Sequence, residues 1–142
     1  RSEWHPEPGK AVGLMAPNAA SVAPLRGSEV LLIQRAFEPY GGLWTLPGGR
    51  HEPGETIEAT AVREIREELA LDVFELRPVL AMRLGSGFLL QVFATRTFEG
   101  DIKPSPEIAD WRWLEPGQIA SLPTTPDLAD VLRRAFGLFE AG

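Results

Sequence analysis

The chain has 142 residues, of which 44% are hydrophobic and 24% charged, so its size and composition are those of one globular domain with a substantial core. The absence of cysteine excludes disulfides and thiolate zinc sites, and no apolar run approaches the ~20 residues of a membrane-spanning helix, so no membrane partner is expected. The net charge of −6 argues against a nucleic-acid polymer as partner but leaves a single nucleotide open, because a bound divalent metal reverses the local field.

The amino-terminal segment, residues 1–18, is expected to be a flexible tail, and residues 19–142 are expected to form the domain. The tail is rich in proline and glycine and has little periodicity, although a short strand is expected near residues 12–16. It lacks the charged-then-apolar pattern of a signal peptide, so we expect a cytoplasmic protein.

Two β-rich segments follow, at residues 19–25 and 29–36, and the Arg26-Gly27-Ser28 turn between them predicts a hairpin. Residues 30–33 form a continuous apolar run, which is typical of a strand covered on both faces. Residues 37–42 are predicted to be a loop. Trp44, just after it, admits two interpretations, burial in the core and stacking on a nucleobase, and the burial habits of tryptophan favour the core.

The most informative segment is residues 49–71, where a turn rich in glycine and proline runs into an uninterrupted helical pattern. The helix is expected to begin after Thr56, a good N-cap residue, and to run to about Ala70. One of its faces carries apolar side chains that can dock against a sheet, namely Val62, Ile65 and Leu69.

Another face of the same helix carries three carboxylates, Glu64, Glu67 and Glu68, at spacings of i, i+3 and i+4. Like charges at these spacings repel each other. A hard divalent cation held by carboxylate oxygens would compensate, whereas a solvated acidic face is the ordinary alternative. Glu55 lies eight residues before Arg63, about two helical turns, so these two side chains can form an ion pair.

This segment resembles the Nudix box, G-x5-E-x7-R-E-U-x-E-E-x-G-U, in which U is aliphatic. The matching positions are Gly49, Glu55, Arg63, Glu64, Ile65, Glu67, Glu68 and Leu71. Ala70 departs from the pattern, because the family has glycine there, at a helix end where φ > 0 is often wanted. We expect this alanine to reduce stability slightly or to shift the turn, without removing a ligand. The strand, glycine turn and helix that such a motif requires are also predicted.

The resemblance implies the Nudix fold, an α/β (α+β) architecture in which a mixed β-sheet is sandwiched between helices (α/β/α). It implies metal-dependent hydrolysis of a pyrophosphate bond in a nucleoside diphosphate linked to a group X. The cofactor is expected to be Mg²⁺, with Mn²⁺ as the alternative. The expected metal ligands are Glu64, Glu67, Glu68 and the Gly48 carbonyl, with Glu55 and Arg63 as an orienting pair.

After the box, residues 73–84 read as a strand that Pro78 confines to a sheet edge or a bulge, followed by a tight turn at residues 85–87. Residues 88–98 are predicted to form one long strand. Its mixed face, made of Gln91, Phe93, Thr95 and Thr97, either lines a pocket or is half exposed. A strand is predicted at residues 110–114. Thr125 and Pro126 are expected to cap an amphipathic closing helix that docks on the sheet.

Three further site residues follow from the resemblance. Arg35, at a strand end, is expected to reach a substrate phosphate, and a solvated strand end is the alternative. Gly49 is expected to let the main chain approach the substrate closely. Glu107, in the loop before the last strand, is expected to be a catalytic carboxylate, with an exposed loop acid as the equal alternative. The general base is either Glu67 or Glu107.

The group X is read by segments outside the box. Residues 42–44 and 122–126 resemble those of ADP-ribose pyrophosphatases, which implies cleavage of ADP-ribose to AMP and ribose 5-phosphate. The first alternative is a MutT-type enzyme that hydrolyses oxidised nucleoside triphosphates. A second alternative is a Nudix-like module that binds a ligand without catalysis. The expected partner is a small nucleotide, and the resemblance allows a homodimer.

Overall fold

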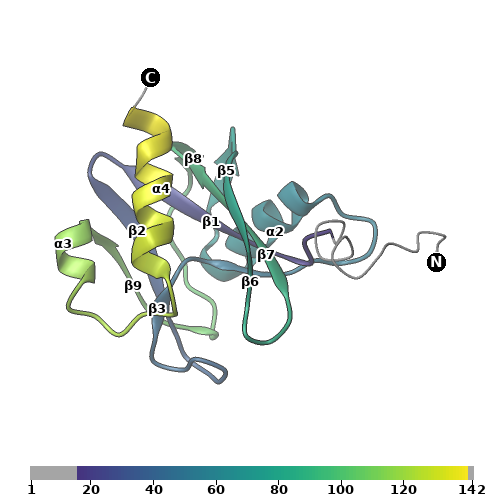
Figure 1. Cartoon of the computed structure of the whole chain (residues 1–142), viewed down its shortest axis with the longest axis horizontal. Coiled ribbons are helices and arrows are strands. Elements are labelled where there is room, and N and C mark those ends of the chain that lie inside the picture. Colours follow the sequence, from purple (N-terminus) through teal and green to yellow (C-terminus); the bar gives the residue numbers. More distant parts are fainter. Residues whose placement is uncertain (1–15, 141–142) are drawn as a thin grey trace.

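The computed structural model describes residues 16–140 (Figure 1). The strand expected near residues 12–16 therefore lies almost entirely outside the described residues. Within them, no helix is long and apolar enough to cross a membrane.

The larger sheet has seven strands within the described residues. They are β1 (Ala19–Arg26), β2 (Glu29–Arg35), β3 (Trp44–Thr45), β4 (Gly48–Arg50), β6 (Arg77–Arg83), β7 (Leu89–Thr95) and β9 (Ile108–Leu114). The order is β3-β2-β1-β7-β6, with β4 also paired to β1 and β9 also paired to β2. The β1–β7 pair is parallel and the other pairs are antiparallel, so the predicted mixed sheet is confirmed. Strands β5 (Asp72–Phe74) and β8 (Thr97–Glu99) form a separate antiparallel pair.

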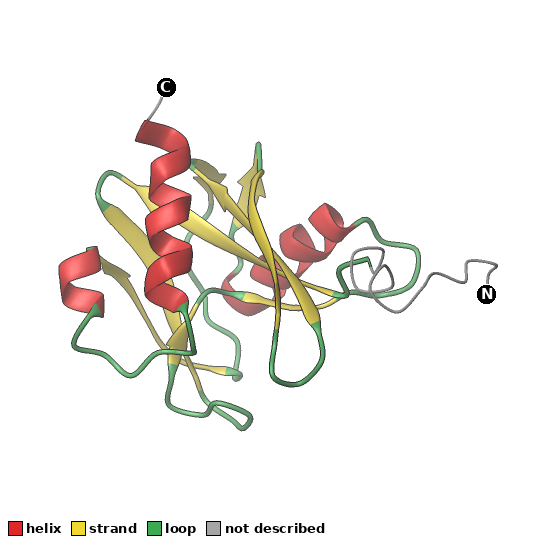
Figure 2. Cartoon of the chain, in the orientation of Figure 1, coloured by secondary structure: helices red, strands yellow, loops and turns green. Residues whose placement is uncertain are grey.

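Helices cover the two faces of the large sheet (Figure 2). Helix α2 (Ile57–Leu69) packs Ala61, Ile65 and Leu69 against one face, together with Val22, Ile33 and Phe93. Helix α4 (Leu128–Glu140) packs Leu128, Val131, Leu132 and Ala135 against the other face, beside the short helix α3 (Pro116–Ile119). The sheet therefore has an apolar core on each side, and the predicted α/β/α arrangement is confirmed.

The ends of α2 follow the local chemistry of their residues. The hydroxyl of Thr56, at the N-cap, accepts the N–H of Ala59 at 3.0 Å, as predicted. At the other end Ala70 has φ 62° and ψ 25°, and its N–H donates to the carbonyl of Arg66 at 2.9 Å. The left-handed conformation that glycine normally supplies is thus kept with an alanine in place, at a steric cost of about 1–2 kcal/mol.

Two predictions about the carboxyl-terminal half are wrong. The strand expected over residues 88–98 is two strands, β7 and β8, which pair with different partners on either side of Arg96. Its mixed face does not line the cleft: Phe93 and Thr95 are buried, whereas Gln91 is half-buried and Thr97 is exposed. Thr125 does not cap α4, since its N–H donates to the Trp44 carbonyl and its hydroxyl to Thr45.

Helix α4 instead begins at Leu128, after Asp127 has turned the chain with φ 67°. Other predictions are confirmed. Pro78 lies at a bulge of the edge strand β6, and Trp44 is buried in the core under α4.

Candidate functional site

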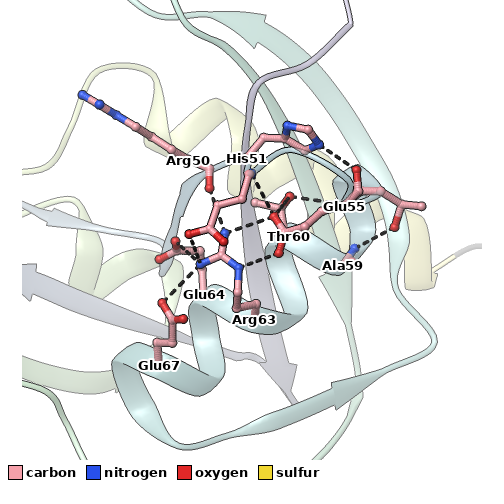
Figure 3. A network of polar contacts seen from close by, with 10 residues as sticks. Arg50, His51, Glu55, Ala59, Thr60, Arg63, Glu64 and Glu67 are labelled. Carbon is pink, nitrogen blue, oxygen red and sulfur yellow. Dashed lines mark hydrogen bonds and ion pairs between the residues drawn. The ribbon is translucent and has the colours of Figure 1, made fainter.

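The guanidinium of Arg63, on α2, is the centre of a polar network (Figure 3). Its Nε lies 2.5 Å from Oε2 of Glu55 and its Nη2 lies 3.1 Å from Oε1, so the pair predicted from sequence spacing is present. The same guanidinium donates to Glu64 at 2.9 Å, to Glu67 at 3.2 Å and to the carbonyl of Arg50 at 2.9 Å. One cation therefore fixes three carboxylates of the box.

Glu55 is held from other sides as well. Its Oε1 accepts the hydroxyl of Thr60 at 2.9 Å and the N–H of Glu52 at 3.0 Å, and Thr60 is fully buried. The hydrogen bond from Arg63 is the main reason why the pKa of Glu55 falls from 4.5 to about 2. In return, the hydrogen bond to Glu55 raises the pKa of Arg63. Both groups stay ionised at neutral pH, which suits an orienting pair.

Glu68 is the buried carboxyl group of the helix, with only 6% of the residue exposed. Its Oε1 accepts the N–H of Gly48 at 3.0 Å, the only hydrogen bond to this side chain from residues 16–140. Burial is the main cause that raises the pKa of Glu68 to about 8, and the charges of Glu64 and Glu107 raise it further. Near neutral pH this carboxyl group keeps a proton unless a cation replaces it.

The two glycines of β4 allow close packing, Gly49 against a carboxyl group of α2 and Gly48 against strand β1. A Cβ atom at Gly49 would overlap the carboxyl group of Glu64, and one at Gly48 would overlap the carbonyl of Ala20 and the side chain of Ser21. The backbone and the carboxylates therefore approach each other more closely than any other residue type would allow. Burial raises the pKa of Glu64 as well, and the hydrogen bond from Arg63 opposes this effect.

These groups meet at a cleft of about 370 Å³, lined by Ile33, Arg35, Phe37, Glu38, Gly48, Gly49, Arg50, Glu64, Glu68, Glu107 and Ile108. The cleft brings together six of the predicted site residues, Arg35, Gly48, Gly49, Glu64, Glu68 and Glu107. Glu55, Arg63 and Glu67 do not line it. The side chain of Glu67 is 58% exposed and is turned toward Arg63 (Figure 3).

Pairing between β2 and β9 brings Arg35 and Glu107 to the cleft from distant parts of the sequence. Arg35 is in register with Ile108, and the N–H of Ala36 donates to the carbonyl of Glu107 at 3.0 Å. The Nε of Arg35 donates to the carbonyl of Pro39 at 2.7 Å, so this side chain also supports the loop after β2. Glu107 is exposed and has no ion-pair partner among the described residues.

The donors in this cleft fit a hard divalent cation. The charge of Glu107 raises the pKa values of Glu64 and Glu68, so these three carboxyl groups lie near one another on the cleft. Oxygen donors of this kind are the ligands that Mg²⁺ and Mn²⁺ prefer. Within residues 16–140, however, no three acidic or histidine side chains converge as a ready metal-binding group. Glu67 would have to turn away from Arg63 to complete one.

Five cleft residues were not predicted as site residues. Two are the buried Ile33 and Ile108, and the others are Phe37 and Glu38, in the loop after β2, and Arg50, which follows the glycine pair. Arg50 could have been found, because it directly continues the turn that approaches the ligand. The loop residues carried no such signal. Conversely, residues 122–126, which supported ADP-ribose as substrate, do not line the cleft, and they bond to β3 through Pro123 and Thr125.

Comparison with known proteins decides the family. The NUDIX domain matches residues 15–135 of the chain. The chain belongs to the Nudix family. The matched region includes residues 49–71, so this segment is the Nudix box and α2 is the Nudix helix.

Named relatives of this Nudix domain act on different nucleotides. The 8-oxo-dGDP phosphatase NUDT18 of Mus musculus is 39% identical over 106 residues, which cover 73% of this chain and 32% of that protein. The NAD-capped RNA hydrolase NudC of Pectobacterium atrosepticum is 36% identical over 104 residues, covering 72% of this chain and 40% of that protein. The ADP-ribose pyrophosphatase of Methanocaldococcus jannaschii is 48% identical over 46 residues, 32% of this chain and 27% of that protein. The chain thus spans about a quarter to two fifths of their lengths.

Solved structures confirm the Nudix fold. The MutT Nudix hydrolase from Burkholderia pseudomallei superposes with a TM-score of 0.75 at 24% identity, covering 84% of this chain and 98% of that one. The Nudix domain of Shewanella oneidensis NrtR, crystallised with ADP ribose, gives a TM-score of 0.73 at 19% identity, covering 93% and 92%. At these identities the likeness establishes the fold alone.

Proposed function

We propose that this Nudix domain hydrolyses a pyrophosphate bond in a small nucleoside diphosphate derivative, with a divalent cation as cofactor. The observation that carries the proposal is the buried carboxyl group of Glu68. Burial and the charges of Glu64 and Glu107 raise its pKa, and the charge of Arg35 does not offset them. No side chain among the described residues forms an ion pair with Glu68. A buried carboxylate without a partner is costly, and a bound metal ion is the usual way to balance such a charge.

Glu64, Glu67, Glu68 and the Gly48 carbonyl would hold this cation, Mg²⁺ or Mn²⁺. When bound, it would neutralise charge on the phosphate oxygens and acidify the attacking water. Arg63 would position Glu64 and Glu67, to which it is already hydrogen-bonded.

Glu107 is the better placed of the two candidate general bases, because it lines the cleft whereas Glu67 is turned away toward Arg63. It would take a proton from water as the water oxygen bonds to phosphorus. The bridging oxygen then leaves with its electron pair, so that two phosphate products form. Arg35 and Arg50, on the same cleft, supply positive charge for the phosphate groups that Glu107 and the buried acids would otherwise repel.

Two substrates compete under this proposal. ADP-ribose, cleaved to AMP and ribose 5-phosphate, is supported by the relative of that activity. Oxidised guanine nucleotides are supported by a relative that matches 73% of this chain, whereas the ADP-ribose pyrophosphatase matches 32%. Residues 122–126 do not line the cleft, which removes part of the case for ADP-ribose. We therefore favour oxidised guanine nucleotides and keep ADP-ribose as the second candidate.

A panel assay tests this choice. ADP-ribose, 8-oxo-dGDP, 8-oxo-dGTP, unmodified nucleotides and NADH are incubated with Mg²⁺ or Mn²⁺, and the products are identified by chromatography and ³¹P NMR. Glu68→Gln should reduce turnover at least 100-fold, because it removes the buried anion but keeps the shape. Glu58→Gln is the matched control, since Glu58 is an exposed acid in the first turn of the same helix.

The non-catalytic alternative predicts a different result. A binding module would retain a nucleotide in a calorimetric titration without releasing any product, and Glu68→Gln would not change a rate. Metal-dependent product release by the unmodified protein would dismiss that alternative. Failure of every substrate on the panel, in the presence of either metal, would refute the proposed reaction.

A further inference from the structure

Phe37 is unusual among the cleft residues because it is apolar and open to solvent. Its residue surface is 61% exposed. The other apolar side chains that line the cleft, Ile33 and Ile108, are buried in the core beneath α2. Within the described residues, Phe37 is therefore the only aromatic ring that lines the cleft and can be reached from it.

The loop that carries Phe37, residues 37–42, is held in a defined shape. Its hydrogen bonds are Gly42 N–H to the Arg35 carbonyl (2.8 Å), Leu43 N–H to the Tyr40 carbonyl (3.0 Å), Arg35 Nε to the Pro39 carbonyl (2.7 Å) and Gln34 Nε2 to the Gly42 carbonyl (3.1 Å). At its start, the N–H of Ala36 bonds to the carbonyl of Glu107 (3.0 Å). Both ends of the loop are thus anchored on β2 and on the segment before β9. The exposed ring is displayed by an ordered loop, so a ligand that contacts it pays little ordering entropy.

The remaining cleft residues supply polar chemistry. Glu64, Glu68 and Glu107 provide anionic oxygens, and Arg35 and Arg50 provide cations. These groups suit a metal-bound diphosphate but give no surface on which a flat, uncharged ring can rest. An aromatic side chain does, since every nucleobase has a π-face that stacks on it.

We propose that Phe37 is the stacking platform for the nucleobase of the substrate. This proposal rests on the proposed function, because it takes the diphosphate to bind among the carboxylates and arginines of the same cleft. Phe37 then contributes to affinity for the nucleoside and not to the reaction at phosphorus.

The test is isothermal titration of the Phe37→Ala protein with GDP and ADP, and with inorganic pyrophosphate as a probe that has the two phosphates and no base, all with Mg²⁺. Loss of one base–aromatic stack should raise the Kd of GDP and ADP about 5- to 100-fold. The Kd of pyrophosphate should stay within twofold. Phe37→Trp keeps a flat ring and should retain or tighten nucleotide binding.

Tyr40→Ala is the matched control. Tyr40 belongs to the same loop and is 42% exposed, but it does not line the cleft, so its loss should leave all three Kd values unchanged. Equal changes for GDP and pyrophosphate in Phe37→Ala, or no change in either, would overturn the stacking role. If Tyr40→Ala weakened nucleotides as much as Phe37→Ala did, the effect would belong to the loop and the proposal would also fall.

These results are separable from the fate of the proposed function. A protein that binds nucleotides through Phe37 but hydrolyses none of them keeps the stacking role and loses the reaction. A protein that hydrolyses nucleotides equally well with and without the Phe37 ring, at substrate concentrations below KM, keeps the reaction and loses the stacking role.

Discussion

Replacing Glu68 by glutamine should make the metal-free protein more stable at alkaline pH, although it should abolish activity. In the unfolded chain this carboxyl group has an ordinary pKa of 4.5, and in the folded protein burial and the neighbouring charges raise it to about 8. Between these two pH values the folded state binds more protons than the unfolded state. The free energy of unfolding therefore falls as the pH rises through this interval, and the loss is complete above pH 8.

The size of the effect follows from the two pKa values of Glu68. At about 1.4 kcal/mol for each pH unit between 4.5 and 8, the ionised carboxylate destabilises the metal-free fold by roughly 5 kcal/mol. Glutamine is neutral at every pH, has the same shape, and keeps an oxygen for the Gly48 N–H. Glu68→Gln should thus match the unmodified protein within about 1 kcal/mol near pH 5 and exceed it by several kcal/mol near pH 8.5.

Urea denaturation in the presence of EDTA, at intervals from pH 5 to 9, measures this difference. Glu58→Gln is the control, because Glu58 is exposed in the first turn of the same helix and lies outside the carboxylate network, so the profile should stay unchanged. Saturating Mg²⁺ should then stabilise the unmodified protein at pH 8.5 more than it stabilises Glu68→Gln. Parallel profiles for the unmodified protein and Glu68→Gln across the whole interval would refute the view that Glu68 is a strained, protonated ligand.

Three other substitutions have defined outcomes. Ala70→Gly should stabilise the protein by about 0.5–1 kcal/mol, because glycine relieves the positive φ and loses some of that gain in chain entropy; a lower denaturation midpoint would contradict this. Gly49→Ala should weaken Mg²⁺ binding at least tenfold in calorimetry by displacing the Glu64 carboxylate, whereas Gly85→Ala, at a position with open space, should not. Thr60→Val should cost about 1–2 kcal/mol in urea denaturation through the lost hydrogen bond to the box carboxylate, and Thr60→Ser should recover most of it.

The Nudix helix could be predicted closely because its determinants are local. The N-cap at Thr56, the apolar stripe through Ile65 and Leu69, and the ion pair across eight residues all depend on helix geometry and side-chain chemistry alone. The positive φ of Ala70 could also be predicted, because the Nudix box has glycine at this helix end.

Features that depend on distant segments were harder to predict. Thr125 and Pro126 have the composition of a helix start, but the hydroxyl of Thr125 finds a better partner in Thr45, so the helix begins later. The alternation of apolar and polar side chains along residues 88–98 predicted a strand. It could not show that the chain pairs with β1 before Arg96 and with β5 after it. Nor could it show that Phe93 faces a second covering layer under α2.

In the cleft, too, the residues of one local segment could be predicted, whereas residues from distant segments could not. The box supplied Glu64 and Glu68, but Phe37 and Glu107 reach them only because β2 and β9 are adjacent, a pairing between segments about 75 residues apart. The spacing of residues in the sequence does not show which distant strands pair with each other. The residues proposed to contact the substrate are the least predictable part of this site, because they lie on loops whose position is set by the sheet and whose conformation is set by a few hydrogen bonds.

Packing explains how the fold tolerates a group of repelling carboxylates at its surface. Ile65 and Leu69, which directly follow Glu64 and Glu68, are fully buried against the sheet, so the apolar face of α2 holds the acidic face in place. Burial of two such side chains contributes about 3–6 kcal/mol, which is comparable to the cost of the ionised Glu68. A metal ion would remove that cost when it binds. The metal ion binds the ionised form of Glu68, so at low pH it must displace the proton on this carboxyl group. The affinity for the metal ion should therefore increase with pH until Glu68 has lost its proton near pH 8.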